Sequence, residues 1–149
     1  MIRKLLVVFA ILMLGVSAAA AQSSCQDVIV KRQTMMKHSG AVAKDGSAMI
    51  RGDAAFDSAK AQQIFATFAE DAAALPTLFP DCSKTGDDTT AGPAIWDKPD
   101  DFKAAIAKFA ADIKTAQDST NDLDSLKTNF QAIGKDCGSC HQSFRVGKS

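Results

Sequence analysis

The chain has 149 residues, a size typical of one ordinary domain, and its 17 basic and 17 acidic residues give it no net charge at neutral pH. This balance argues against a nucleic-acid-binding protein and gives no reason to expect an anionic membrane as a partner. Tyr is absent and the β-branched residues are scattered, which favours helices over strands.

Residues 1–21 are typical of a secretory signal peptide. Arg3 and Lys4 supply a positive start, and residues 5–16 form an apolar run that is short for a membrane span. Residues 19–21 are the small Ala residues that precede many cleavage sites. We therefore expect export to the periplasm and a mature domain over residues 22–149. No later run is apolar enough for a transmembrane segment, so we expect no membrane anchor.

Four segments carry apolar residues at spacings of three and four, the period of an amphipathic helix. They run from about 25 to 44, 57 to 75, 100 to 117 and 123 to 145. Gly46 is a plausible stop for the first segment, and Pro76 ends the second. Residues 76–99 form an unusually long connection, which hints at a functional role. Four helices of comparable length predict an all-α fold, an antiparallel (up-down-up-down) four-helix bundle.

The fourth segment contains Cys137-Gly138-Ser139-Cys140-His141, the Cys-x-x-Cys-His attachment pattern of c-type haem. The two thiols add to the vinyl groups of the porphyrin, and the imidazole binds the iron as an axial ligand. On a helix, Cys137 and His141 lie four residues apart on one face, and Cys140 follows Cys137 by three. We expect one covalent haem c inside one end of the bundle, with both cysteines at core-facing positions.

Zinc and a redox dithiol are the alternatives for this motif. A zinc site would need two further ligands, for which only Cys25, Cys82, His38 and carboxylates are available. A redox dithiol usually follows a strand, and no strand pattern precedes this motif. The upstream export signal favours haem. We expect His38 to be a solvated surface residue.

The C-terminal motif and the Phe144-Arg145 pair after it resemble the class II c-type cytochromes, the cytochrome c′ family. Three further stretches resemble the family: Arg32-Gln33, Leu75-Pro76-x-x-Phe79, and the segment from Thr89 to Trp96. The resemblance covers nearly all of the mature chain.

This resemblance implies roles for four residues beyond the motif. Arg32 and Gln33 match residues near the haem propionates, and a guanidinium is suited to binding carboxylate. Thr89 and Thr90 match a loop that touches the haem, although the family usually has an acidic residue where this chain has Thr90. Arg145 matches a basic residue near the proximal imidazole.

The family has two branches, which differ at the residue four positions after the Arg. In five-coordinate cytochromes c′ this residue is usually bulky and does not bind the iron, whereas in the low-spin branch it is a ligating Met. Here that residue is Met36, so the resemblance implies His141 and Met36 as the axial ligands. Core packing of Met36 and ligation by Met35 stay open.

The implied function is a periplasmic mono-haem electron carrier that exchanges electrons with redox partner proteins. No nucleophile–base pair or paired carboxylate points to an enzyme. The alternative is a five-coordinate cytochrome c′ that binds nitric oxide or carbon monoxide. Members of the family often dimerise, so a monomer and a homodimer both stay open.

Two cysteines remain after haem attachment. Cys25 lies at the start of the first predicted helix and Cys82 just past the end of the second, and these ends are neighbours in an antiparallel pair. Because the periplasm permits disulfides, we expect a Cys25–Cys82 bond, with free thiols as the alternative.

Overall fold

The computed structural model describes residues 2–86 and 88–147, with side chains from Cys25 onward. Four long helices form this part of the chain: α1 (Ile2–Arg51), α2 (Ser58–Ala74), α4 (Pro99–Ser119) and α5 (Leu123–Phe144). The connection between α2 and α4 contains two short 3₁₀ helices, η1 (Leu75–Thr77) and η2 (Asp81–Ser83), and the single turn α3 (Ala94–Asp97). Within the described residues the only extended pairing is an isolated antiparallel bridge between Ala91 and Arg145.

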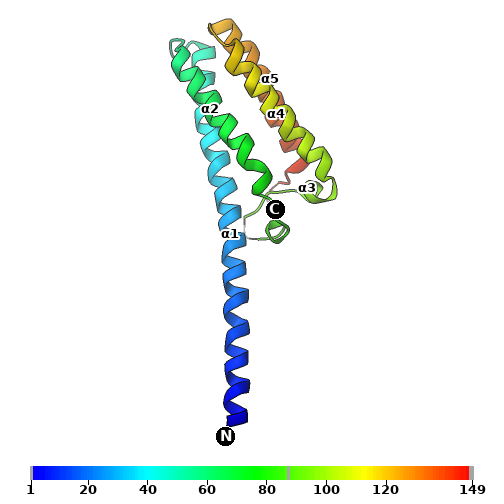
Figure 1. The fold of residues 1–149 in the computed structure, drawn as a ribbon. Helices are drawn as coiled ribbons and strands as arrows, with labels where there is room; N and C mark the ends of the chain where they lie inside the picture. The colour runs from blue at the N-terminus through cyan, green and yellow to red at the C-terminus, as the bar shows by residue number, and fades with distance from the viewer. Residues whose placement is uncertain (1, 87, 148–149) are drawn as a thin grey trace.

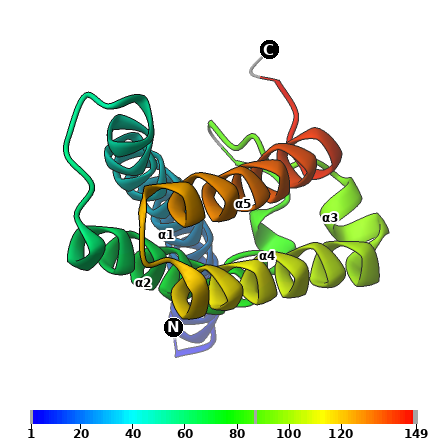
Figure 2. The same ribbon diagram turned by 90° about the horizontal axis from the view of Figure 1, so that it is seen from above.

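The helices run up, down, up and down, and they form two antiparallel pairs (Figures 1 and 2). One pair is α2 with the C-terminal half of α1, and the other is α4 with α5. The pairs meet where α2 and α5 begin, and they diverge toward the end that holds α3 and the C-terminus (Figure 1). Around the bundle, α1 contacts α2, α2 contacts α4, α4 contacts α5, and α5 contacts α1. The prediction of an antiparallel four-helix bundle is confirmed.

The predicted helix ends hold for three helices, because local capping sets them. The Asp57 side chain accepts a hydrogen bond from the Lys60 amide at 3.0 Å and starts α2. Asp122 and Ser125 form a reciprocal capping box at the start of α5. Pro99 occupies the first turn of α4, where its missing N–H costs nothing.

The predicted end of the first helix at Gly46 is wrong, because α1 continues to Arg51. Gly46 is buried, and a Cβ there would lie 2.5 Å from the Phe130 ring, so this glycine permits close packing of α1 against α5. Burial of Met49 in the next turn offsets the cost of about 1 kcal/mol for a glycine within a helix. The helix ends instead at Arg51, just before Gly52, whose φ of 81° lies in the left-handed region.

The predicted signal peptide forms the N-terminal part of α1, which projects away from the bundle (Figure 1). Its side chains lie outside the described residues, so cleavage after residue 21 stays a prediction. None of the helices searched within the described part of the chain is long and apolar enough to cross a membrane.

The core consists of two apolar clusters at opposite ends of the bundle. The first joins α1, α2, α4 and α5 and includes Met49, Phe65, Ile113 and Leu126, all nearly inaccessible to solvent. The second lies at the end with α3 and contains Leu75, Ile95, Phe102, Ile106 and Phe144. Phe102 and Phe144 pack edge to face with ring centroids 5.1 Å apart.

Cys25 and Cys82 form the expected disulfide, with Cα atoms 5.8 Å apart. The bond ties α1 at Cys25 to η2 at Cys82, and it closes a loop with a sequence separation of 57. It therefore fastens the α2–α4 connection to α1.

Replacing both cysteines of this disulfide with Ser should lower the free energy of unfolding by about 4 kcal/mol, because the unfolded chain gains the entropy of an open loop. Denaturant titration of the haem-loaded protein measures the loss.

Peptide mass mapping without reduction should recover the linked Cys25 and Cys82 peptides. Alkylation of both thiols without prior reduction would contradict the assignment.

Candidate haem-binding site

The attachment motif occupies the last two turns of α5. Cys137 and Cys140 are free thiols; Cys137 is exposed, whereas Cys140 is half-buried against the second apolar cluster. His141 is exposed, one turn after Cys137. The motif thus presents two thiols and an imidazole from adjacent positions of one helix, the donor set that covalent attachment of haem c requires.

The prediction that both cysteines face the core is correct only for Cys140. The buried positions follow the spacing Ile133, Asp136 and Cys140, so the core face passes through Asp136 rather than Cys137. Asp136 is 6% exposed, and its Oδ1 accepts a hydrogen bond from Lys108 Nζ on α4 at 2.6 Å. A carboxylate interrupts the apolar pattern of this face in the sequence. Lys108 on α4 pairs with Oδ1 and offsets part of the cost of burying the charge, whereas the buried Oδ2 has no hydrogen-bond partner among the described residues.

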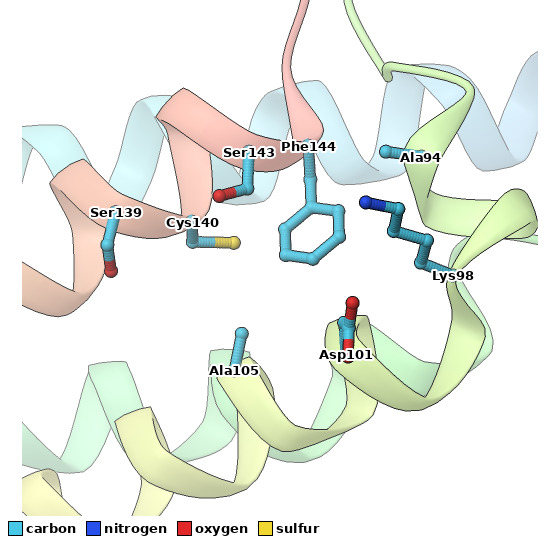
Figure 3. Close-up of a pocket in the computed structure, with 8 residues that line it drawn as sticks. All are labelled: Ala94, Lys98, Asp101, Ala105, Ser139, Cys140, Ser143 and Phe144. Atoms are coloured by element: carbon cyan, nitrogen blue, oxygen red, sulfur yellow. The ribbon is translucent and has the colours of Figure 1, made fainter.

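Cys140 borders a pocket of about 410 Å³ between α5, α4 and α3. Figure 3 shows its sulfur pointing into the space between α5 and α4, beside the Phe144 ring. Ala105 of α4 bounds the opposite side, and Lys98 directs its ammonium group toward the same space. The thiol is therefore directed toward the divergent end of the bundle and its apolar cluster.

The ionisable groups of the motif favour their neutral forms. Partial burial raises the pKa of the Cys137 thiol, and the nearby Asp136 carboxylate adds to this increase. Burial also raises the pKa of Cys140. Desolvation, and then the charge of Arg145, lower the pKa of His141. A neutral imidazole keeps a nitrogen lone pair, which an axial iron ligand needs.

The two candidate thioethers lie on α1 and differ in their packing. Met35 packs against the second apolar cluster, to which Cys140 also contributes. Met36 is 38% exposed and lies outside both clusters. The side chain of Met36 therefore packs less against the rest of the chain than that of Met35.

Arg32 is 6% exposed and is bound by the α2–α4 connection. Its Nη1 donates to the Leu78 carbonyl at 3.1 Å and to Ser83 Oγ at 2.9 Å. Its Nη2 donates to the Ser83 carbonyl at 3.1 Å and to Thr89 Oγ1 at 2.5 Å. Four of the five guanidinium N–H groups thus have partners within the chain. The guanidinium also lies 5.0 Å from the centroid of the Phe79 ring.

The structure brings the other predicted haem-edge residues to the same end of the bundle. Gln33 Nε2 donates to the Asp88 carbonyl at 2.9 Å, next to Thr89. The Thr90 carbonyl accepts from the Val146 amide at 2.9 Å, just beyond α5. Residues from α1, the connection and α5 therefore meet, although their sequence positions lie far apart. Sequence analysis missed Ser83, which is fully buried against Arg32, because an isolated Ser in a loop carries no pattern.

The zinc alternative finds no support in the described side chains. Cys25 and Cys82, two of its candidate ligands, are joined in the disulfide. Across the residues searched, no cluster of three or more His, Cys, Asp or Glu side chains could hold a metal ion. His38 is exposed, as expected.

A polar contact joins α1 to α2 beside Met35. Ser39 Oγ donates a hydrogen bond to the Asp71 carboxylate, and it also lies 3.1 Å from the Met35 carbonyl. Asp71 is only 9% exposed, and this burial raises its pKa above 3.8 despite the hydrogen bond from Ser39. Between the unfolded and folded pKa values, the folded state binds more protons. The stability that the neutral carboxyl contributes is therefore complete below the unfolded pKa and is lost as pH rises through the folded pKa.

Asp71→Asn should remove this pH-dependent loss, since a neutral amide can still accept from Ser39. The variant should gain stability relative to wild type as pH rises from acid to neutral, measured by denaturant titration across that range. Gln63→Ala, at an exposed and uncharged position of the same helix, is the control and should leave the difference nearly constant. A gap between Asp71→Asn and wild type that does not change with pH would contradict the assignment.

Comparison with known proteins gives consistent matches over this domain. The family model described as Cytochrome C' matches residues 27–145. A cytochrome c' from Rhodopseudomonas palustris is 42% identical over 139 residues, which cover 93% of each chain. A cytochrome c-556 from Agrobacterium fabrum is 35% identical over 149 residues, covering 99% of this chain and 100% of the relative.

Two solved structures share the fold at substantial sequence identity. The cytochrome c' from Rhodopseudomonas palustris has a TM-score of 0.78 and 43% identity, over 83% of this chain and 98% of that chain. The oxidised cytochrome c556 from the same organism has a TM-score of 0.75 and 34% identity, over 83% and 99%. Relatives of both names are therefore similar to this chain.

Proposed function

Because this chain belongs to the cytochrome c′ family, whose members bind haem c covalently, we propose that it is a periplasmic electron carrier whose iron is held by His141 and Met36. Cys137 and Cys140 attach the cofactor, and the cleaved signal peptide directs export. Haem c supplies an iron that alternates between the ferrous and ferric states. The chain supplies the ligands, the apolar surroundings and the orientation. We assign it no enzymatic step.

The residues fit the cofactor in chemistry and in placement. Two free thiols and the His141 imidazole project from adjacent turns of α5, and Cys140 faces an apolar cluster. The observation that carries the proposal is that α1 and α5 are neighbours in the bundle. A thioether on α1 and an imidazole on α5 therefore come from neighbouring helices, so Met36 and His141 would hold the iron of the cofactor between them.

Met36 is preferred over Met35 because it follows Arg32 by four residues, the position of the ligating Met in the low-spin branch that the sequence resembles. The guanidinium of Arg32 is bound by the α2–α4 connection, and Met36 follows one helical turn later on the same face of α1. Met35 already packs in the apolar cluster. Held by these two side chains, the iron would keep the same ligands in both oxidation states, and electron transfer would require little rearrangement of the chain. Redox proteins of the periplasm are the partners, and a homodimer is compatible with the family.

The optical spectrum of the purified, haem-loaded protein tests this proposal. Low-spin, six-coordinate spectra in both oxidation states are expected. A high-spin, five-coordinate spectrum would contradict Met36 ligation and would favour the alternative, a cytochrome c′ that binds nitric oxide or carbon monoxide. Sequence identity to relatives named c' and c-556 leaves this choice to the spectrum.

A further inference from the structure

The segment 88–92, called the clasp below, connects α1 to α5 at the divergent end of the bundle. On the α1 side, Gln33 donates to the Asp88 carbonyl at 2.9 Å, and Arg32 donates to Thr89 Oγ1 at 2.5 Å. The Ala91 amide also donates to Thr89 Oγ1, at 3.3 Å, which shapes the turn. Side chains from α1 therefore set the path of the clasp.

On the α5 side, the clasp is bound through its backbone. The Gly92 amide donates to the Phe144 carbonyl at 2.7 Å, and the Val146 amide donates to the Thr90 carbonyl at 2.9 Å. A Cβ at Gly92 would lie 3.0 Å from the Phe144 carbonyl oxygen, so glycine suits this close approach. Movement of the clasp would therefore move the end of α5.

The two attachments lie one turn beyond the two proposed iron ligands. Arg32 precedes Met36 by four residues, and Phe144, whose carbonyl binds the clasp, follows His141 by three. Since α1 and α5 run in opposite directions, both attachments lie toward the same end of the bundle (Figure 1). Four helical residues span about 6 Å, so the clasp acts within one turn of each ligand.

Ser83 holds Arg32 in this arrangement. It is fully buried, and its hydroxyl and carbonyl accept hydrogen bonds from the two terminal nitrogens of the guanidinium. Ser83 Oγ also donates to the Pro80 carbonyl at 2.8 Å, which orients the lone pairs toward Arg32. The adjacent Cys82 is fastened to α1 by the disulfide. Ser83 is therefore anchored on both sides.

We propose that Ser83 is a positioning residue that acts through Arg32 and the clasp to hold α1 against α5, and so holds Met36 on the iron. This inference rests on the proposed axial ligation by Met36. The Cys25–Cys82 disulfide supports the same contact by holding Ser83 close to α1. Loss of the Ser83 hydroxyl removes one hydrogen bond that holds the Arg32 guanidinium. Arg32 then positions Thr89 less firmly, and the end of α5, which the clasp binds, becomes more mobile.

The test compares haem-loaded wild type, Ser83→Ala and the control Thr77→Ala. Thr77 is exposed and bonds only the Ala74 carbonyl nearby, so its hydroxyl does not reach Arg32. The readouts are carbon monoxide affinity of the ferrous protein and amide hydrogen exchange at residues 144–146. Ser83→Ala should bind carbon monoxide more tightly, by at most about tenfold, which is the factor reached if the full free energy of one hydrogen bond to a charged group is transmitted to the ligand. Its exchange at 144–146 should also be faster.

Hydrogen exchange tests whether the clasp couples α1 to α5, and the optical spectrum tests whether Met36 binds the iron. Unchanged exchange at 144–146 in Ser83→Ala would overturn the clasp even if residues 78–83 loosened. If wild type is already five-coordinate and Ser83→Ala still exchanges faster at 144–146, the coupling of the helices is supported and Met36 ligation is overturned. If Ser83→Ala does not fold, the double variant Cys25→Ser, Cys82→Ser takes its place, with the same expected directions.

Discussion

Met36→Ala should change the haem-loaded protein from low spin to high spin and lower its reduction potential. A thioether is a soft, neutral donor that stabilises ferrous iron, so its removal favours the ferric state. The bundle should survive, since Met36 lies outside both apolar clusters and the haem stays attached through Cys137 and Cys140. Optical spectra and a redox titration measure the two changes, and carbon monoxide should bind more readily.

Met35→Ala is the matched control, one residue away on the same helix. Met35 is half-buried against the second apolar cluster, so its truncation should cost less than the loss of about 2–5 kcal/mol typical of a fully buried Met and should leave the spectrum low spin. If Met35→Ala loses the low-spin spectrum while Met36→Ala keeps it, the assignment of the two methionines is reversed.

Replacing both Cys137 and Cys140 with Ala should abolish covalent haem, because no thiol then remains on α5 to react with the vinyl groups. Haem staining of denaturing gels measures this loss directly. The variant with Ser at positions 25 and 82 is the control and should keep its haem stain, since those sulfurs are joined in the disulfide. A stained band in the double Ala variant would show that another residue attaches the cofactor.

The apolar spacing of three and four located the helices, because the period of an amphipathic helix is a local property of the sequence. It was misleading where packing between helices overrode it. Gly46 reads as a stop, yet α1 continues for a further turn because the glycine allows close approach to Phe130. The same periodicity placed Cys137 on the core face, which Asp136 occupies instead because Lys108 on α4 pairs with its carboxylate.

Some residues of the site could be predicted from the sequence, and others could not. The attachment motif is contiguous, so Cys137, Cys140 and His141 could be recognised without a fold, and resemblance to the family pointed to Arg32, Gln33, Thr89, Thr90 and Met36. Ser83 could not be found, because its importance depends on a hydrogen bond to a residue far away in the sequence. Whether the helices bearing Met36 and His141 are neighbours or diagonal partners was likewise undetermined.

The sequence alone determined that this chain is all-α, that one helix carries a haem attachment motif, and that Cys25 and Cys82 could pair. The helices and the attachment motif depend only on residue spacing within a segment. The possible pairing of Cys25 with Cys82 depends on two helix ends that an antiparallel pair brings together. Only the tertiary structure decided that α1 lies beside α5, that Arg32 is buried by the α2–α4 connection, and that the clasp joins the two helices. Each of these depends on contacts between residues distant in sequence, where burial and hydrogen bonding select one arrangement among several that the helical pattern permits.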